Sequence, residues 1–185
     1  TTLTGTTHLH LTNCTFNSPF NQILPRITCG TGNQFNEAFF IDVTGDLPSS
    51  ISGAFNYSFA LRNIVRSGTG TLTLESNNFQ SYLAVTNNNN SGSIVGKGNE
   101  VYSRVDVFNY ADSPVDLAYE GGTTTFSNQV LLVNTQNGTI SIGLGGGTAT
   151  LQNSASLQIG AFGTGTVSLN NLTVNGIYNP SVTTL

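Results

Sequence analysis

Apolar and polar residues alternate with a period of two along most of this chain, and this pattern constrains the fold more than any other feature. Ile51–Leu61 shows it over the longest stretch, with Ile51, Phe55 and Phe59 at odd positions and small or polar residues at even ones. A period of two places successive side chains on opposite faces of a β-strand. No segment has an apolar stripe with the 3.6-residue period of a helix. We therefore expect an all-β protein in which the odd face of 51–61 is core.

Further alternating segments predict more strands, separated by clusters of Gly, Asn, Ser and Pro. These segments are residues 23–29, 39–43, 71–74, 82–85, 101–107, 115–119, 129–133, 139–144, 156–159 and 164–174. The clusters recur about every 8–12 residues, a spacing that is typical of β-sandwiches and barrels. The expected architecture is an antiparallel β-sandwich, built from two β modules and preceded by a free N-terminal strand.

The composition changes near Gly121-Gly122, because every charged residue and most aromatic residues precede it. We expect an N-terminal strand at 1–12, a main sandwich module at 13–120 and a Gly/Thr/Asn-rich β module at 121–185. The last two segments can also form one continuous domain. A loose repeat relates residues 148–151 to 164–167, and it fits either coils of a β-solenoid or plain hairpins. Two imperfect copies favour hairpins, since solenoids usually need three or more.

Charged residues make up only 8% of the chain, and the net charge is −4 with five Lys and Arg in total. Such a chain lacks the basic surface that neutralises nucleic-acid phosphates. No apolar run approaches the roughly 20 residues of a membrane span. An uncharged polar surface weakens repulsion between copies and is typical of extracellular proteins that associate. The chain has no Met and starts at Thr1, as expected of a processed product or a fragment, so we predict an extracellular or cell-surface location.

Two cysteines, Cys14 and Cys29, fit the same location. An even number of cysteines in a secreted chain is usually paired, so we expect a disulfide between them. The alternative is a pair of reduced, buried thiols.

Five Asn-x-Ser/Thr sequons are candidate N-glycosylation sites: Asn13, Asn56, Asn89, Asn137 and Asn171. Chance alone produces about this number of sequons in a chain so rich in Asn, Ser and Thr. The position of each sequon is therefore a better guide to glycosylation than their number. Asn89 lies in an Asn-rich segment expected at a loop tip, and Asn56 on the polar side of a strand.

The chain contains no nucleophile elbow, zinc-protease motif, phosphate-binding loop or dinucleotide fingerprint. We therefore expect no catalytic residues, no metal site and no cofactor. His8 and His10 share one strand face, but a structural zinc site needs about four ligands, which favours solvated side chains.

Two groups of carboxylates are candidate calcium ligands, because strand-end loops supply carboxylates and carbonyls together. They are Asp112, Asp116 and Glu120, and Glu37, Asp42 and Asp46. Neither group has the EF-hand spacing, so exposed loop charges are favoured over a calcium site.

The aromatic residues on alternating strands are expected in the core rather than in a sugar-binding platform. Four tyrosines near loops are the candidates for stacking on carbohydrate instead: Tyr82, Tyr102, Tyr110 and Tyr119.

The segment Thr1–Thr12 has the pattern of an uncharged terminal strand. One face carries Leu3, Gly5, Thr7, Leu9 and Leu11, and the other carries His8 and His10. Such a strand either pairs within its own domain or completes the sheet of a neighbouring copy by β-augmentation.

Together with the Thr/Asn/Ser/Gly-rich β pattern and the Cys14–Cys29 pair, this strand resembles subunits of extracellular filaments built by donor-strand exchange, particularly archaeal thread and bundling-pilus proteins. The resemblance implies a filament subunit for adhesion or biofilm, whose N-terminal strand fills a groove in the next copy. It also implies partners that are copies of the chain, with host or surface glycans as further partners. The alternatives are a viral or phage fibre head and a secreted carbohydrate-binding module.

Overall fold

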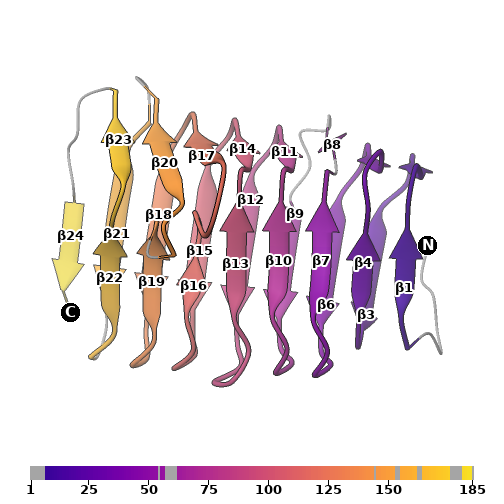
Figure 1. Cartoon of the computed structure of the whole chain (residues 1–185), viewed down its shortest axis with the longest axis horizontal. Coiled ribbons are helices and arrows are strands. Elements are labelled where there is room, and N and C mark those ends of the chain that lie inside the picture. Colours follow the sequence, from indigo (N-terminus) through magenta and orange to yellow (C-terminus); the bar gives the residue numbers. More distant parts are fainter. Residues whose placement is uncertain are drawn as a thin grey trace.

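The computed structural model describes residues 7–53, 55–56, 62–143, 145–152, 155–161, 164–175 and 181–184. In these residues the chain winds into a parallel β-solenoid with three sheets of eight strands each (Figure 1). Each coil of the chain contributes one strand to each sheet, and successive coils lie side by side along the long axis.

Sheets A, B and C take every third strand in chain order. Sheet A holds β1 (Leu9–Leu11), β4 (Ile27–Cys29), β7 (Ser49–Ser52), β10 (Leu72–Glu75), β13 (Ile94–Lys97), β16 (Val115–Asp116), β19 (Thr139–Ile142) and β22 (Thr166–Leu169). Sheet B holds β2 (Thr15–Phe16), β5 (Gln34–Phe35), β8 (Phe55–Asn56), β11 (Asn78–Phe79), β14 (Glu100–Val101), β17 (Thr123–Phe126), β20 (Thr148–Leu151) and β23 (Leu172–Val174). Sheet C holds β3 (Phe20–Leu24), β6 (Phe39–Val43), β9 (Arg62–Arg66), β12 (Leu83–Asn87), β15 (Val105–Asn109), β18 (Val130–Asn134), β21 (Leu157–Ala161) and β24 (Ser181–Thr184).

The interior of the solenoid is filled by the alternate residues that point inward from all three sheets. Fully buried examples are Ile27, Ile41, Ile64, Leu72, Ile94, Val107, Val130, Leu132 and Ile140. At the N-terminal end, Phe20 stacks on Phe39 with ring centroids 5.5 Å apart, and Phe16 stacks on Phe35 at 4.9 Å. The alternation along each strand therefore separates the interior from the outer surface.

The corner between sheets A and B is short, and it depends on a left-handed residue followed by an inward asparagine. Ser76 and Gly98 have φ values of 53° and 59°, a conformation that turns the chain sharply. The next residues, Asn77 and Asn99, are buried, and Asn77 Nδ2 donates to Asn99 Oδ1 at 3.0 Å. Asn99 Nδ2 also donates to the Leu74 carbonyl at 2.8 Å, so the side-chain amides satisfy backbone groups that the turn leaves unpaired.

A second buried asparagine ladder follows the ends of the sheet C strands. Asn87, Asn109 and Asn134 are each 0% exposed. Asn87 Nδ2 donates to Asn109 Oδ1 at 3.2 Å, and Asn109 Nδ2 donates to Asn134 Oδ1 at 3.3 Å. Asn134 Nδ2 donates to the Gly138 carbonyl at 2.7 Å. The ladder links three successive coils through the interior.

Two arginines of β9, Arg62 and Arg66, are also fully buried. Arg66 donates from Nη1 to the Val43 carbonyl at 2.6 Å, from Nη2 to Gly45 at 2.8 Å and from Nε to Gly70 at 2.6 Å. Burial lowers the pKa of Arg62 to about 10 and also lowers the pKa of Arg66. Apart from Gly70, which follows β9 in the chain, these carbonyls belong to the preceding coil, so the guanidinium groups link adjacent coils.

The expected antiparallel β-sandwich is wrong, because every strand pair in the described part of the chain is parallel. Alternation reports which face of a strand is buried, but not the direction of the strand beside it. The coils also differ in length: Leu9 pairs with Ile27, 18 residues on, whereas Thr139 pairs with Thr166, 27 residues on. This drift hides the repeat. The solenoid, which the sequence offers as an alternative for the tail alone, extends through the described part of the chain.

The continuous strand expected at Ile51–Leu61 is also wrong. β7 ends at Ser52, Gly53 has a φ of 59°, and β8 covers only Phe55–Asn56. The alternation there continues across a corner between two sheets. Residues 57–61 lie outside the described residues, as do the side chains expected in the core at Phe55 and Phe59.

The expected donor-strand complementation by the N-terminal strand is also wrong. Within Thr1–Thr12, Leu9 and Leu11 belong to β1, which pairs in parallel with β4 of the same chain and buries both leucines in its own core. Thr7 is exposed, and Leu3 and Gly5 lie outside the described residues. Since its own chain already pairs this strand, β1 is an ordinary first strand of sheet A.

The three sheets continue across the expected module boundary, since β14 pairs with β17 and β15 with β18. The division into 13–120 and 121–185 stays a prediction.

The expected disulfide is absent: Cys14 and Cys29 are free thiols. Cys29 faces the interior in register with Leu11. Cys14 lies half-buried at a corner, where its N–H donates to Asn33 Oδ1 at 3.0 Å. The two cysteines occupy different register positions in adjacent coils, which the sequence spacing does not reveal.

This arrangement predicts unequal thiol reactivity in the folded protein. Burial, and secondarily the neighbouring Cys14, raises the pKa of the Cys29 thiol to about 12, so its reactive thiolate is scarce. We expect iodoacetamide near pH 8 to alkylate Cys14 much faster than Cys29, as followed by mass spectrometry of peptides. In denaturant both should react readily. Equal rates in the native protein, or no reaction without a reductant, would contradict the assignment.

Candidate binding groove on sheet A

The outer face of sheet A carries a groove of about 700 Å³ over strands β10, β13 and β16. Its lining combines hydroxyl groups, an aromatic ring, carboxylates and one ammonium group. The lining residues are Thr71, Thr73, Glu75, Ser93, Ile94, Val95, Lys97, Pro114, Asp116, Tyr119, Glu120, Ser141 and Gly145.

The floor of the groove is an outward-facing row of sheet A in which each residue pairs in register with the next. Thr73 pairs with Val95, Val95 with Asp116, and Asp116 with Ser141. Thr73 and Val95 are half-buried, whereas Asp116 is 5% exposed and Ser141 is 0% exposed. The row is therefore accessible over β10 and β13 and covered over β16 and β19.

Two long corners provide this cover. Residues 117–122 join β16 to β17, and residues 143–147, of which 144 lies outside the described residues, join β19 to β20. Between β10 and β11 the corner has only two residues. At these longer corners, the number of residues between paired positions of sheet A also increases, as it does between Val115 and its partner Ile140. They form a wall at the C-terminal end of the groove.

The carboxylate of Asp116 holds the two corners together. Asp116 Oδ1 accepts hydrogen bonds from the backbone N–H groups of Ala118 at 3.1 Å and Gly143 at 3.2 Å, and Oδ2 accepts one from Gly145 at 3.1 Å. A buried carboxylate with three amide donors is a strong structural tie. Asp116 is one of the candidate calcium ligands of the sequence, but its oxygens bind backbone amides.

Tyr119 forms the aromatic part of the wall and is 38% exposed. Its backbone N–H donates to the Gly96 carbonyl at 2.7 Å. A Cβ at Gly145 would lie 2.3 Å from two carbons of the Tyr119 ring, and a Cβ at Gly147 only 1.9 Å from the Tyr119 carbonyl oxygen. Glycine at position 145 is thus required for the ring to lie against the second corner, and the ring and Gly145 both line the groove.

Polar side chains border the floor on both sides. Lys97 Nζ lies 3.4 Å from Glu75 Oε1, and both side chains are about 40% exposed, so this ion pair is weak. Thr71 Oγ1 and Ser93 Oγ are 3.0 Å apart on the opposite side. Glu120 is exposed beside Tyr119.

The other three tyrosines considered for carbohydrate stacking lie outside the groove. Tyr102 donates from its hydroxyl to Glu100 Oε2 at 3.0 Å. Tyr110 is 46% exposed and stacks on Phe108, with centroids 6.0 Å apart. Of the four candidate tyrosines, Tyr119 is therefore the one that lines the groove.

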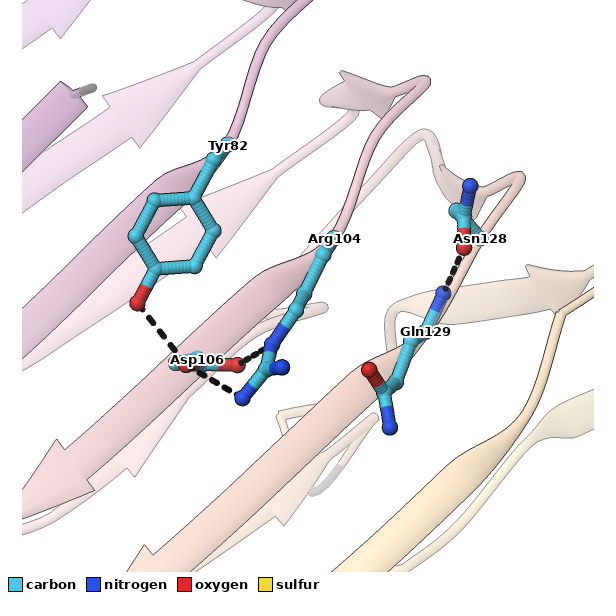
Figure 2. A network of polar contacts seen from close by, with 5 residues as sticks. All are labelled: Tyr82, Arg104, Asp106, Asn128 and Gln129. Atoms are coloured by element: carbon cyan, nitrogen blue, oxygen red, sulfur yellow. Dashed lines mark hydrogen bonds and ion pairs between the residues drawn. The ribbon is translucent and has the colours of Figure 1, made fainter.

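Figure 2 shows Tyr82 in a polar network at the outer face of sheet C. The Tyr82 hydroxyl donates to Asp106 Oδ2 at 2.8 Å, and Arg104 donates to both Asp106 oxygens, at 2.6 and 2.8 Å. Burial and then the hydrogen bond to Asp106 raise the pKa of Tyr82 to about 12. Nearby, Asn128 Oδ1 accepts the backbone N–H of Gln129 at 2.7 Å. Because its partners hold the Asp106 carboxylate, this network ties two coils together structurally.

The histidines and the carboxylates do not gather into a metal site within the part of the chain that the structure describes. His8 and His10 are exposed on β1 or just before it, and His8 Nε2 lies 3.0 Å from Thr28 Oγ1. Asp46 Oδ1 accepts the Thr69 hydroxyl at 2.7 Å, and Asp112 Oδ1 accepts the Asn137 N–H at 3.2 Å. The expectation of a chain without metal, cofactor or catalytic residues stays a prediction.

Three of the five sequon asparagines are exposed: Asn13, Asn137 and Asn171. Asn89 is half-buried, and its Nδ2 donates to the Ser67 carbonyl at 3.0 Å. The side chain of Asn56 lies outside the described set. Glycosylation at these positions stays a prediction.

Among the described residues there is no helix with the length and apolar character that crossing a membrane requires. No protein-family model, curated protein or solved structure matches the chain. The function is therefore inferred from the fold and the groove.

Proposed function

We propose that this chain is an extracellular β-solenoid module that binds glycans through the sheet A groove, as part of a cell-surface or viral fibre. This proposal rests on the position of the Tyr119 ring, which lies against Gly145 at the end of a groove lined with hydroxyl groups and carboxylates. The low charge of the chain supports the location, since uncharged polar surfaces are typical of extracellular association.

The lining matches the surface of a sugar better than that of an apolar ligand. A pyranose ring offers a C–H face that packs on an aromatic ring, and hydroxyl groups that exchange hydrogen bonds along its edge. Tyr119 supplies the first kind of contact, and Thr73, Ser93 and Glu120 supply the second. Because the solenoid holds the floor by backbone pairing, little ordering accompanies binding.

The test is glycan binding by the purified chain, measured by calorimetry and on an array of oligosaccharides. Tyr119→Ala should weaken binding about tenfold or more, which corresponds to about 1.4 kcal/mol. Tyr119→Phe keeps the ring and should retain most of the affinity. Tyr110→Ala is the matched control, because Tyr110 is as exposed but lies outside the groove. Equal affinity of the Tyr119→Ala and Tyr110→Ala variants would refute the assignment of the site.

A filament subunit is the second candidate, favoured by the last coil of the described chain. Its inward side chains Val167, Leu169, Leu172 and Val174 are only half-buried against the core. A parallel coil of another copy stacked there would cover them and form an open-ended, head-to-tail assembly. The proposed similarity to archaeal thread and bundling-pilus proteins is then that the chain forms filaments, and it does not include strand donation. Sedimentation velocity over a concentration series tests it, and a protein that stays monomeric throughout would reject it.

A further inference from the structure

The outer row of sheet A that forms the groove floor continues well beyond the groove toward the N-terminus. Thr73 pairs with Ser50, Ser50 with Thr28, and Thr28 with His10. Thr28 and Ser50 are half-buried and His10 is exposed. The row is thus at least partly exposed from β1 to β13, and we call this stretch the track.

At its other end the track stops. Asp116 and Ser141 continue the row in register but are buried beneath the corners at 117–122 and 143–147. Ser168, the next residue of the row, is half-buried again on β22, beyond the wall. A chain lying along this track from the N-terminal side would therefore end against Tyr119.

The spacing of the track favours an extended glycan that runs along the solenoid axis. Neighbouring strands lie about 4.8 Å apart, which is close to the advance of one sugar in an extended chain. Each sugar would then contact one strand, with a hydroxyl group presented by Thr73 and Ser50 on successive coils and an aliphatic side chain by Val95.

The charges of the groove favour an uncharged glycan. The carboxylate of Asp116 accepts backbone amides, and Glu75 lies beside Lys97, the one cation among the described lining residues. Glu120 adds an exposed carboxylate next to Tyr119. The carboxylates of Glu75 and Glu120 outnumber the Lys97 ammonium group in the lining, so a polyanionic chain would meet net repulsion there.

We propose that the groove binds the terminal segment of an uncharged, extended glycan, with the last sugar on Tyr119 and the chain running over Val95, Thr73 and Ser50 toward β1. This inference rests on the proposed function and specifies the ligand of the same site.

The experiment uses neutral oligosaccharides of the gluco, manno, xylo and N-acetylglucosamine series, from disaccharide to hexasaccharide, with oligogalacturonides as the anionic arm. Affinity for the neutral ligand should rise with length up to about a tetrasaccharide, one sugar for each strand contacted. A bulky label on one end of the ligand should abolish binding, while the same label on the other end should leave it unchanged. Ser50→Arg, on the track but outside the groove lining, should weaken tetrasaccharide binding about tenfold and leave disaccharide binding unchanged.

The outcomes separate this inference from the function on which it rests. If neutral glycans bind but tolerate labels at both ends, the groove binds internal segments and the terminal assignment is overturned. A preference for oligogalacturonides overturns the charge assignment, and a Ser50→Arg effect that does not depend on ligand length overturns the axis assignment, while glycan binding stands in both cases. If no glycan binds, the proposed function itself fails. Binding by Tyr119→Phe, with matching melting temperatures for all variants, excludes loss of fold as the cause.

Discussion

Leu132→Ala should destabilise the protein by about 2–5 kcal/mol, whereas Leu131→Ala should cost about 1 kcal/mol or less. The two leucines are neighbours in β18, but Leu132 is 0% exposed in the interior and Leu131 is half-buried on the outer face. Truncating the inner residue leaves a cavity that the parallel sheets around it cannot easily close. Chemical denaturation with matched m-values measures both variants, and similar losses would mean that the assignment of faces is wrong.

The same position tests the parallel pairing. Leu132 lies in register between Val107 and Ile159 of the adjacent coils. Combining Leu132→Ala with Val107→Ala should give a double-mutant coupling of about 0.5 kcal/mol or more, because the two truncations share one cavity. Strict additivity of the two losses would contradict the register.

Asn109→Ala should destabilise the protein by about 2–4 kcal/mol, through hydrogen bonds rather than packing. Asn109 Nδ2 donates to the Ser113 carbonyl at 3.1 Å and to Asn134 Oδ1 at 3.3 Å, while Asn109 Oδ1 accepts from Asn87 Nδ2. Alanine leaves these buried groups without their partner, and each unsatisfied group costs about 1–3 kcal/mol. The loss is partly offset where a group keeps a second hydrogen bond.

The control for the ladder is Asn88→Ala, since Asn88 is exposed one residue beyond β12. It should change the free energy of unfolding by no more than about 0.5 kcal/mol. Thermal and denaturant unfolding of both variants supply the comparison. An Asn109→Ala protein as stable as Asn88→Ala would show that the ladder contributes little.

The candidate groove was only partly predictable from the sequence. Tyr119 was considered for sugar stacking, but nothing in the sequence separated it from Tyr82, whose hydroxyl the structure pairs with Asp106. The signal that could have found the site is the long corner at 117–122, with Gly145 in the next one. Such an insertion becomes visible only once the shorter corners of the other coils are known.

The sequence by itself determined the β class, the inner and outer faces of most strands, and the low charge of the surface. These are local properties, because alternation depends on each residue and its immediate neighbours. The tertiary structure decided that the strands are parallel, that β1 pairs with its own chain, and that Cys29 faces the interior away from a disulfide. It also decided that Asn77 and Asn109 are buried, where their side chains link neighbouring coils. The physical reason is that strand direction depends on where each corner delivers the chain, and coils of unequal length reach the same register without repeating in sequence.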